Sequence, residues 1–285
     1  MILVADAGSS RIDWALIDKA GKARHYDTEG FNPYYKEIEA FENILEKDLI
    51  SVIDDKAVEE IYYYGSGCST DKKKMLVDEA LEKHFPDAHI EVDHDLLGAA
   101  RALLGNEEGI ACILGTGSNS CYYDGTKIAE NLPSLGYLYG DEGSGTYMGK
   151  SLITAYLQNK LPEKVKSGFD KKYKLSLESI LDASYNQGMP NRFLSAFSEF
   201  ISEQLSDEFL RNMVKSSMDD FFSLQILKYS RHDKVPVNFT GSVAFAFKDI
   251  LKEVAEKYKV RIGKIEKKPI GGLVEFHQPE VKGAF

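Results

Sequence analysis

Apolar strand-like runs alternate with amphipathic helical stretches along the first third of the chain. Residues 2–5 are apolar and residues 12–17 alternate, and between them lies a turn of small residues, which predicts a β-hairpin. Further strands are expected at 61–64 and 90–92, and helices at 34–47, 71–85 and 96–104. This order of strands and helices is typical of an α/β fold.

The opening pattern returns about a hundred residues later. An apolar strand at 110–114 leads into the turn Gly115-Thr116-Gly117-Ser118-Asn119, and a second strand follows at 120–123. A repeat of this length corresponds to one domain. We therefore expect two similar halves, with an N-terminal domain at 1–105 and a C-terminal domain at 106–285.

Helical sequence from about 145 to 230 interrupts the second half, where we expect a helical insertion. Strands are then predicted at 235–239 and 260–262, with a helix between them that ends at Tyr258. Gly271-Gly272 indicates a turn. A return of the last residues to the N-terminal domain is left open.

Composition narrows the range of partners. The chain has 285 residues, with 45 acidic and 35 basic side chains and a formal net charge of −10, which disfavours nucleic acid and anionic membrane surfaces. No apolar run is long enough to span a membrane. The three cysteines lie in no metal-ligand spacing. We expect a cytoplasmic protein with reduced thiols, no membrane association and a small-molecule partner.

The two glycine-rich turns could bind phosphate. Small residues allow backbone N–H groups to approach phosphate oxygens, and the hydroxyl groups of Ser9, Ser10, Thr116 and Ser118 add donors. Either turn alone could be an ordinary hairpin. Asp6 ends an apolar strand, where a carboxylate is costly unless it is hydrated or faces a cation, and Mg²⁺ that accompanies ATP would fit there.

Two further segments are candidates for binding. Thr240-Gly241-Ser242 follows an apolar strand and opens a helix, which suits close approach of a nucleotide. In Gly140–Gly145, two carboxylates between glycines could bind sugar hydroxyls or a cation, although Asp141 or Ser144 could instead cap the next helix. Residues 144–151 end like a P-loop but lack its first glycine and its leading strand, so we reject that interpretation.

Phosphoryl transfer to an alcohol also needs a base near the acceptor hydroxyl. Asp93 and Asp95 are the candidates, because they follow a strand and begin a helix, although either could be a helix cap. The side chain of His94 is expected to point away from Asp95.

These motifs, in this order and over nearly the whole chain, resemble the sugar kinase, heat-shock protein and actin superfamily. Within it, the sequence is most similar to N-acetylglucosamine kinases and the related BadF/BadG/BcrA/BcrD ATPases. The resemblance implies two ribonuclease-H-like (actin-like ATPase) domains, with ATP and Mg²⁺ in an interdomain nucleotide cleft. It also implies transfer of the γ-phosphate to the 6-hydroxyl of an amino sugar.

The resemblance implies a role for each matching residue. Asp6 would orient hydrated Mg²⁺, and Asp95, in Asp95-Leu96-Leu97-Gly98-Ala99, matches the family's D-x-x-G-[AS] element and would be the base. The other implied contacts are Gly8, Ser9, Ser10, Thr116 and Gly117 with the phosphates, Gly241 and Ser242 with the adenosine, and Asn32, Asn119 and Asp141 with the sugar.

The sequence also departs from the family pattern. Ala7 replaces a glycine of the usual D-G-G-x-[TS] turn, and the segment around Asn32 keeps little beyond the asparagine. A type III pantothenate kinase, an ATP-hydrolysing activator of a 2-hydroxyacyl-CoA dehydratase with an iron–sulfur cluster, and a non-catalytic sensor are the alternatives. The acceptor and the oligomeric state, including a homodimer, are left open.

Overall fold

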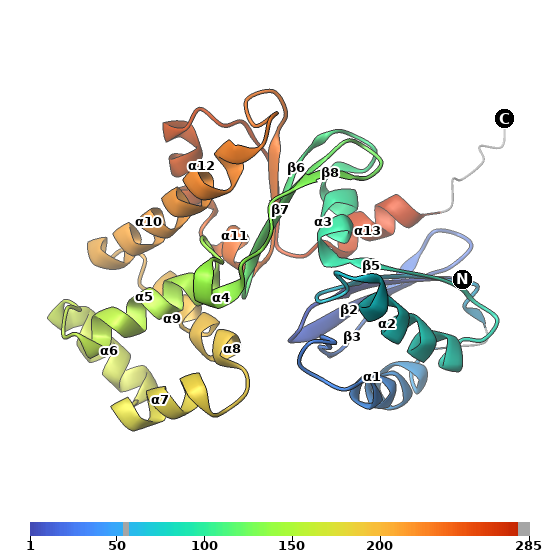
Figure 1. Cartoon of the computed structure of the whole chain (residues 1–285), viewed down its shortest axis with the longest axis horizontal. Helices are drawn as coiled ribbons and strands as arrows, with labels where there is room; N and C mark the ends of the chain where they lie inside the picture. The colour runs from blue at the N-terminus through green and yellow to red at the C-terminus, as the bar shows by residue number, and fades with distance from the viewer. Residues whose placement is uncertain (54–56, 279–285) are drawn as a thin grey trace. The chain divides into compact units, whose positions relative to one another are not determined.

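A computed structural model describes residues 1–53 and 57–278 (Figure 1). The chain forms two compact units, each with its own five-stranded sheet. The first comprises Met1–Glu107, Gly125–Lys127 and the described residues from Lys268 onward, and the second comprises Glu108–Asp124 and Ile128–Lys267. The predicted α/β class is therefore confirmed.

The sheet of the first unit has the strand order β3-β2-β1-β4-β5. β1, β2 and β3 form an antiparallel meander, and β4 and β5 add to β1 in parallel. The strands are β1 Ile2–Ala7, β2 Arg11–Ile17, β3 Ala23–Glu29, β4 Glu60–Gly65 and β5 His89–His94. A parallel strand needs a crossover connection, which α2 (Asp71–His84) supplies between β4 and β5.

Apolar side chains cover both faces of this sheet. On one face, Leu3, Ala5 and Trp14 pack with residues of α1 (Ile38–Ile44), α2 and the π-helical turn η1 (Leu45–Ile50). On the other face, Val4 and Ala15 pack with residues of α3 (Asp95–Leu104) and α13 (Ile270–His277). The alternation of inward side chains along β1 thus places one helical layer on each face.

The prediction of a turn at Gly271-Gly272 was wrong, because both glycines lie inside helix α13. A Cβ at Gly272 would lie 2.2 Å from the carbonyl oxygen of Ala102, so this glycine allows α13 to pack closely against α3. The ring of His277 stacks on Tyr62 and its Nε2 is hydrogen-bonded to the hydroxyl group of Tyr64. Burial lowers the pKa of His277 to about 4, so it is neutral at pH 7.

The second sheet repeats the order of the first, as β10-β9-β6-β7-β8. β6, β7 and β8 form the antiparallel meander, and β9 and β10 add in parallel. The strands are β6 Gly109–Leu114, β7 Ser118–Tyr123, β8 Ile128–Asn131, β9 Val237–Thr240 and β10 Ile262–Glu266. The repeat expected from the two glycine-rich turns is thereby confirmed.

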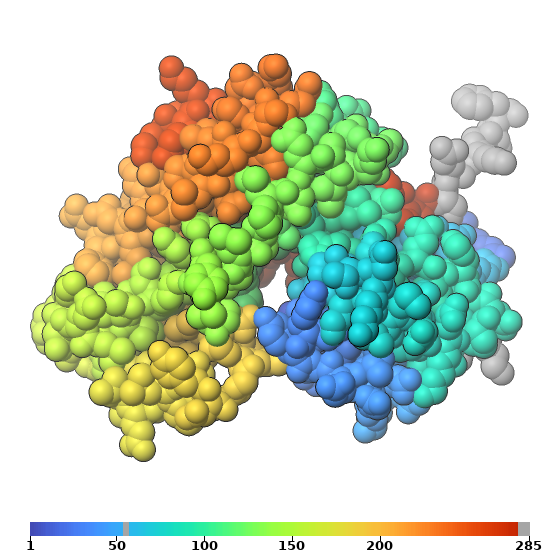
Figure 2. Space-filling view, in the orientation of Figure 1, coloured from blue at the N-terminus to red at the C-terminus, as the bar shows by residue number. Residues whose placement is uncertain are grey.

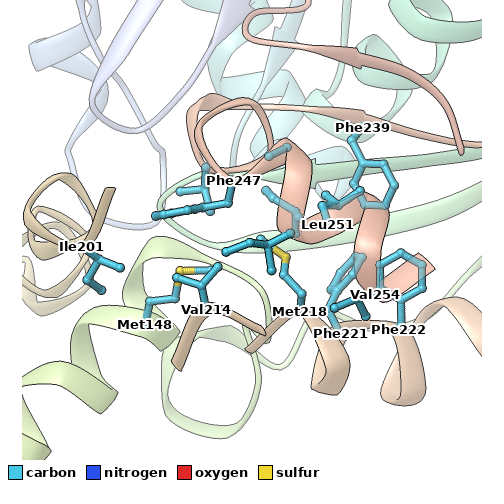
Figure 3. Close-up of a cluster of buried hydrophobic side chains, with 14 of the residues drawn as sticks. Met148, Ile201, Val214, Met218, Phe221, Phe222, Phe239, Phe247, Leu251 and Val254 are labelled. Atoms are coloured by element: carbon cyan, nitrogen blue, oxygen red, sulfur yellow. The ribbon is translucent and has the colours of Figure 1, made fainter. Parts of the chain in front are cut away.

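The expected helical insertion lies between β8 and β9. Its helices lie on one side of the second sheet in Figure 1, and their atoms gather in one region of the space-filling view in Figure 2. They pack through apolar side chains such as Phe221 and Phe222, which Figure 3 shows. They are α4 Gly136–Tyr139, α5 Gly145–Leu157, α6 Glu163–Tyr173, α7 Leu177–Tyr185, α8 Pro190–Ser195, α9 Phe197–Glu203, α10 Glu208–Leu224 and η3 Ile226–Lys228. After β9 come α11 (Ser242–Ala246) and α12 (Lys248–Lys257). Among the described residues, no helix is long and apolar enough to cross a membrane.

Gly149 gives a direct test of this packing. A Cβ at this position of α5 would lie 1.9 Å from the carbonyl oxygen of Leu194 in α8, and two backbones cannot easily move apart. We expect Gly149→Ala to destabilise the protein by about 1–3 kcal/mol in thermal or urea unfolding. Gly168→Ala in α6 is the matched control, because its Cβ would meet only the flexible end of Gln204. Equal stability of the two variants would contradict this packing.

Candidate active site

Asp6 lies near the end of β1, on the face of the first sheet that α3 and α13 cover. It pairs in register with Asp13 of β2 and Tyr64 of β4. The side chain is half-buried. Its pKa is raised to about 7, first by burial and then by the charges of Asp95 and Asp13, while Lys268 opposes the shift. Asp6 is thus a carboxylate whose surroundings favour a cation.

This arrangement fits hydrated Mg²⁺. Two further carboxylates, Asp13 and Asp95, raise the pKa of Asp6, and a nearby divalent cation would relieve that repulsion. Oxygen ligands are those that Mg²⁺ prefers, and it usually keeps several of its waters. Within the described residues, no three His, Cys, Asp or Glu side chains form a metal-binding group.

The turn Gly8-Ser9-Ser10 connects β1 to β2 tightly. The backbone N–H of Gly8 donates to the carbonyl oxygen of Arg11 at 2.9 Å. Gly30 packs against the turn, and a Cβ there would lie 2.3 Å from the backbone of Arg11. Ala7 belongs to β1 rather than to the turn, and its methyl group is buried in the core. Its replacement of a glycine therefore leaves the turn unobstructed.

Asn32 lies beside the turn Gly8-Ser9-Ser10, and its side-chain amide is hydrogen-bonded within the protein. Its Nδ2 donates to the hydroxyl oxygen of Ser9 at 2.9 Å and, at 3.4 Å, to that of Ser66. Its Oδ1 accepts the N–H of Tyr34 at 2.9 Å. The structure thus brings together a residue expected at the sugar and a residue expected at the phosphates. Ser66 joins them and was not identified from the sequence.

Asp95 is the first residue of α3, where β5 ends. Gly98 allows the first turn of α3 to pack closely against β4, because a Cβ there would lie 2.7 Å from the side chain of Tyr64. Oδ1 of Asp95 is buried and has no hydrogen bond among residues 1–53 and 57–278. It lies 3.0 Å from Nδ1 of His94, which accepts the N–H of Leu96. While His94 Nδ1 acts as an acceptor, Oδ1 receives no hydrogen bond and keeps its lone pairs for a hydroxyl group that reaches it.

Two expectations about this segment are now resolved. The prediction that His94 points away from Asp95 was wrong, because His94 caps α3 and its ring turns toward the helix start. Neither aspartate is the cap. Asp93 forms an ion pair with Lys74 of α2. Asp95 therefore suits the role of base better than Asp93.

In the second unit, the turn between β6 and β7 is held by the start of α5. The carbonyl oxygen of Thr116 accepts the hydroxyl group of Thr146 at 2.6 Å and its N–H at 3.1 Å. The side chain of Asp141 accepts the N–H of Ser118 at 3.2 Å, and a Cβ at Gly117 would lie 3.0 Å from that carboxylate. Burial raises the pKa of Asp141, and the Ser118 bond opposes the rise. Thr116, Gly117 and Asp141 thus form one cluster.

The cap of α5 is Ser144, whose hydroxyl oxygen accepts the N–H of Tyr147 at 3.2 Å. Of the two capping alternatives, Ser144 is therefore confirmed, and Asp141 is left to face the turn. The P-loop-like letters at 144–151 lie within this cap and helix, in agreement with their rejection. Asn119, in β7, turns its Oδ1 to the N–H of Ser120 at 2.9 Å.

Gly241 connects β9 to α11 as the N-cap of the helix, with φ 117° and ψ 157°, a conformation that glycine adopts readily. A Cβ would lie 2.2 Å from the carbonyl oxygen of Leu114, so the backbone of Gly241 passes directly over the end of β6. Ser242 follows and is exposed. Both residues directly follow Thr240, whose buried hydroxyl group has no hydrogen bond among the described residues.

Comparison with solved structures supplies close and distant relatives. The chain is 39% identical to a candidate N-acetylglucosamine kinase from Porphyromonas gingivalis, with 98% of this chain and 99% of that one covered and a TM-score of 0.93. A similar candidate from Chromobacterium violaceum is 14% identical, with 96% and 98% covered and a TM-score of 0.71. A ROK family glucokinase from Streptomyces griseus, in complex with glucose and AMPPNP, is 14% identical, with 96% and 97% covered and a TM-score of 0.57.

The two distant structures show the shared actin-like fold alone. No protein-family model and no curated protein sequence matches the chain. The alignment at 39% identity covers 98% of this chain and therefore includes both units. The chain therefore belongs to the N-acetylglucosamine kinase and BadF/BadG/BcrA/BcrD ATPase family of the sugar kinase, heat-shock protein and actin superfamily.

Proposed function

We propose that this protein is an ATP-dependent sugar kinase that phosphorylates the 6-hydroxyl of N-acetylglucosamine or a related amino sugar. The observation that carries the proposal is the buried, unbonded Oδ1 of Asp95, on the same face of the first sheet as Asp6. It is supported by the 39% identity to a candidate N-acetylglucosamine kinase and by AMPPNP in the more distant glucokinase.

In the proposed reaction, Oδ1 of Asp95 accepts the proton of the sugar hydroxyl. The freed oxygen forms a bond to the γ-phosphorus of ATP, and the bond from that phosphorus to the bridging oxygen breaks, which releases ADP. Asp95 keeps the proton until the products leave. For this step, the site must hold the sugar hydroxyl within hydrogen-bonding distance of Oδ1 of Asp95.

Each remaining residue binds or orients a substrate group. Gly8, Ser9 and Ser10 in the first unit, and Thr116 and Gly117 in the second, would bind phosphate oxygens through N–H and hydroxyl groups. Gly241 and Ser242 would bind the adenosine, and Asn32, Asn119 and Asp141 the sugar. Asp6 would orient water on Mg²⁺, which when bound offsets part of the phosphate charge. Asn32 must exchange its bond to Ser9 for a bond to the ligand.

The cysteines do not favour the iron–sulfur alternative. Cys68, Cys112 and Cys121 are all buried. No two of them lie close together in the sequence, and each side chain is enclosed within its own unit. A cluster shared by two subunits would also need cysteines at the surface. We therefore place the dehydratase activator below the kinase.

An ADP-release assay with ATP, Mg²⁺ and a panel of acceptors tests the proposal. The panel contains N-acetylglucosamine, glucosamine, N-acetylmannosamine, glucose and pantothenate. We expect the highest kcat/KM with an amino sugar and ADP release that depends on its presence. Turnover with pantothenate alone would favour the pantothenate kinase, and no turnover with any acceptor would contradict the proposal.

A further inference from the structure

A row of carboxylates crosses the first sheet beside the phosphate turn. Asp6 of β1, Asp13 of β2 and Asp27 of β3 are successive register partners, so their side chains share one face. Asp95 adds a fourth carboxylate near Asp6. Arg11 bridges Asp13 and Asp27, at 3.2 and 3.1 Å. The turn residues Gly8, Ser9 and Ser10 lie between Asp6 and Arg11 in the chain.

Lys268 is the second cation of the row. It follows β10 and precedes α13, and its Nζ lies 2.7 Å from Oδ1 of Asp13. Asp13 is the direct cross-strand partner of Asp6. The charge of Lys268 acts on Asp6, whose pKa it lowers. Lys268 thus places its ammonium group on the cross-strand partner of Asp6, the residue expected to orient Mg²⁺.

Asp13 does not need Lys268 for its own neutralisation. Nε of Arg11 already lies 3.2 Å from the same carboxylate oxygen, and the Asp13 side chain is only 16% exposed. Lys268 is 43% exposed and reaches in from another segment of the chain. An ammonium group on a flexible stem can exchange one acceptor for another at small cost, and phosphate oxygens are strong acceptors for lysine.

We propose that Lys268 is a further phosphate-binding residue of this kinase, held ready by Asp13 and transferred to an oxygen of the ATP phosphates when nucleotide binds. This inference rests on the proposed function. Its charge would stabilise the phosphates on the side of Asp6 and the Gly8–Ser10 turn, where the described residues otherwise place four carboxylates and Arg11, which is paired with two of them.

Calorimetric titration with AMPPNP and Mg²⁺, without sugar, tests the proposal. Lys268→Met should weaken nucleotide binding about tenfold or more, because a charge-assisted hydrogen bond is lost. Lys268→Gln should weaken it to a similar extent, although its amide can still donate to Asp13. Lys268→Arg, which keeps the charge, should stay within about threefold of the wild type. Lys267→Met, a change at the exposed neighbour, is the matched control and should bind normally.

The outcomes separate this inference from the kinase proposal. Normal AMPPNP binding by Lys268→Met or Lys268→Gln would overturn the role of Lys268 and leave the kinase proposal standing. Equal losses in Lys268→Met and Lys268→Arg, together with a lower Tm in both, would show a structural ion pair and also overturn it. Failure of the wild type to bind AMPPNP would contradict both proposals.

Discussion

Asp95→Asn is expected to abolish sugar phosphorylation while nucleotide binding persists. Oδ1 of Asp95 is the buried carboxylate oxygen without a hydrogen bond at the start of α3. An amide of the same shape cannot accept the hydroxyl proton as a carboxylate does. We expect kcat to fall by about 10²–10⁴, the usual contribution of a general base, with the AMPPNP dissociation constant within about threefold of the wild type because the phosphate turn is unchanged.

Asp93→Asn is the matched control for this prediction. Asp93 lies two residues earlier and is also part-buried, but it forms an ion pair with Lys74 and is not placed as the base. We expect it to retain kcat within about tenfold, with its main effect on stability. If Asp95→Asn turned over at the wild-type rate, or if Asp93→Asn alone were inactive, the assignment of the base would be wrong.

Asp6→Asn is expected to have opposite effects on activity and stability. Activity should fall by about 10²-fold or more, because the residue that we propose to orient the water on Mg²⁺ loses its charge. Stability of the ligand-free protein should rise at pH 8. The carboxylate of Asp6 is half-buried beside Asp13 and Asp95, and its pKa is raised to about 7. The folded protein therefore carries an unfavourable charge that asparagine removes.

The pH dependence follows from the direction of this shift. A carboxyl group whose folded pKa exceeds its unfolded value stabilises the fold most below the unfolded pKa, near 4, and loses that contribution as the pH rises through about 7. The shift corresponds to at most about 4 kcal/mol, and we expect a measured gain of about 1–3 kcal/mol after solvent relaxation.

Thermal unfolding of the wild type and Asp6→Asn, without nucleotide or Mg²⁺, measures this gain. The variant should have the higher Tm at pH 8, and the two proteins should converge at pH 4–5. Asp87→Asn, which changes an exposed carboxylate of the same unit, should leave Tm unchanged at both pH values. A lower Tm for Asp6→Asn at pH 8 would show that the Asp6 carboxylate stabilises the ligand-free fold. It would contradict the unfavourable effect of burial and of the neighbouring carboxylates on that charge.

The backbone pattern was predictable because it depends on local sequence. The alternation of apolar residues and the echo of the first turn at Gly115 indicated two related sheets, and both are present with the same strand order. Gly271-Gly272 was interpreted as a turn because two glycines usually end an element. Both lie inside α13, where Gly272 packs against the backbone of Ala102 in α3, far away in sequence.

The candidate site was predictable only in part, because local sequence does not show which distant residues contact one another. Asp6 lies near the end of one strand and Asp95 directly follows another, which the sequence can show, whereas their partners come from other parts of the fold. Ser66 reaches Asn32, Gly30 supports the phosphate turn, and Lys268 contacts Asp13 across 255 positions of the chain. Long-range contacts of this kind leave no periodic signal in a single sequence.

The most direct test of the central claim is identification of the reaction product. Wild-type protein would be incubated with ATP, Mg²⁺ and N-acetylglucosamine, and the sugar examined by phosphorus and carbon NMR, with Asp95→Asn in parallel. The account predicts one phosphomonoester on the 6-oxygen for each ADP formed, and no product from the variant. Phosphate on another oxygen, or ADP formed without any sugar phosphate, would contradict it.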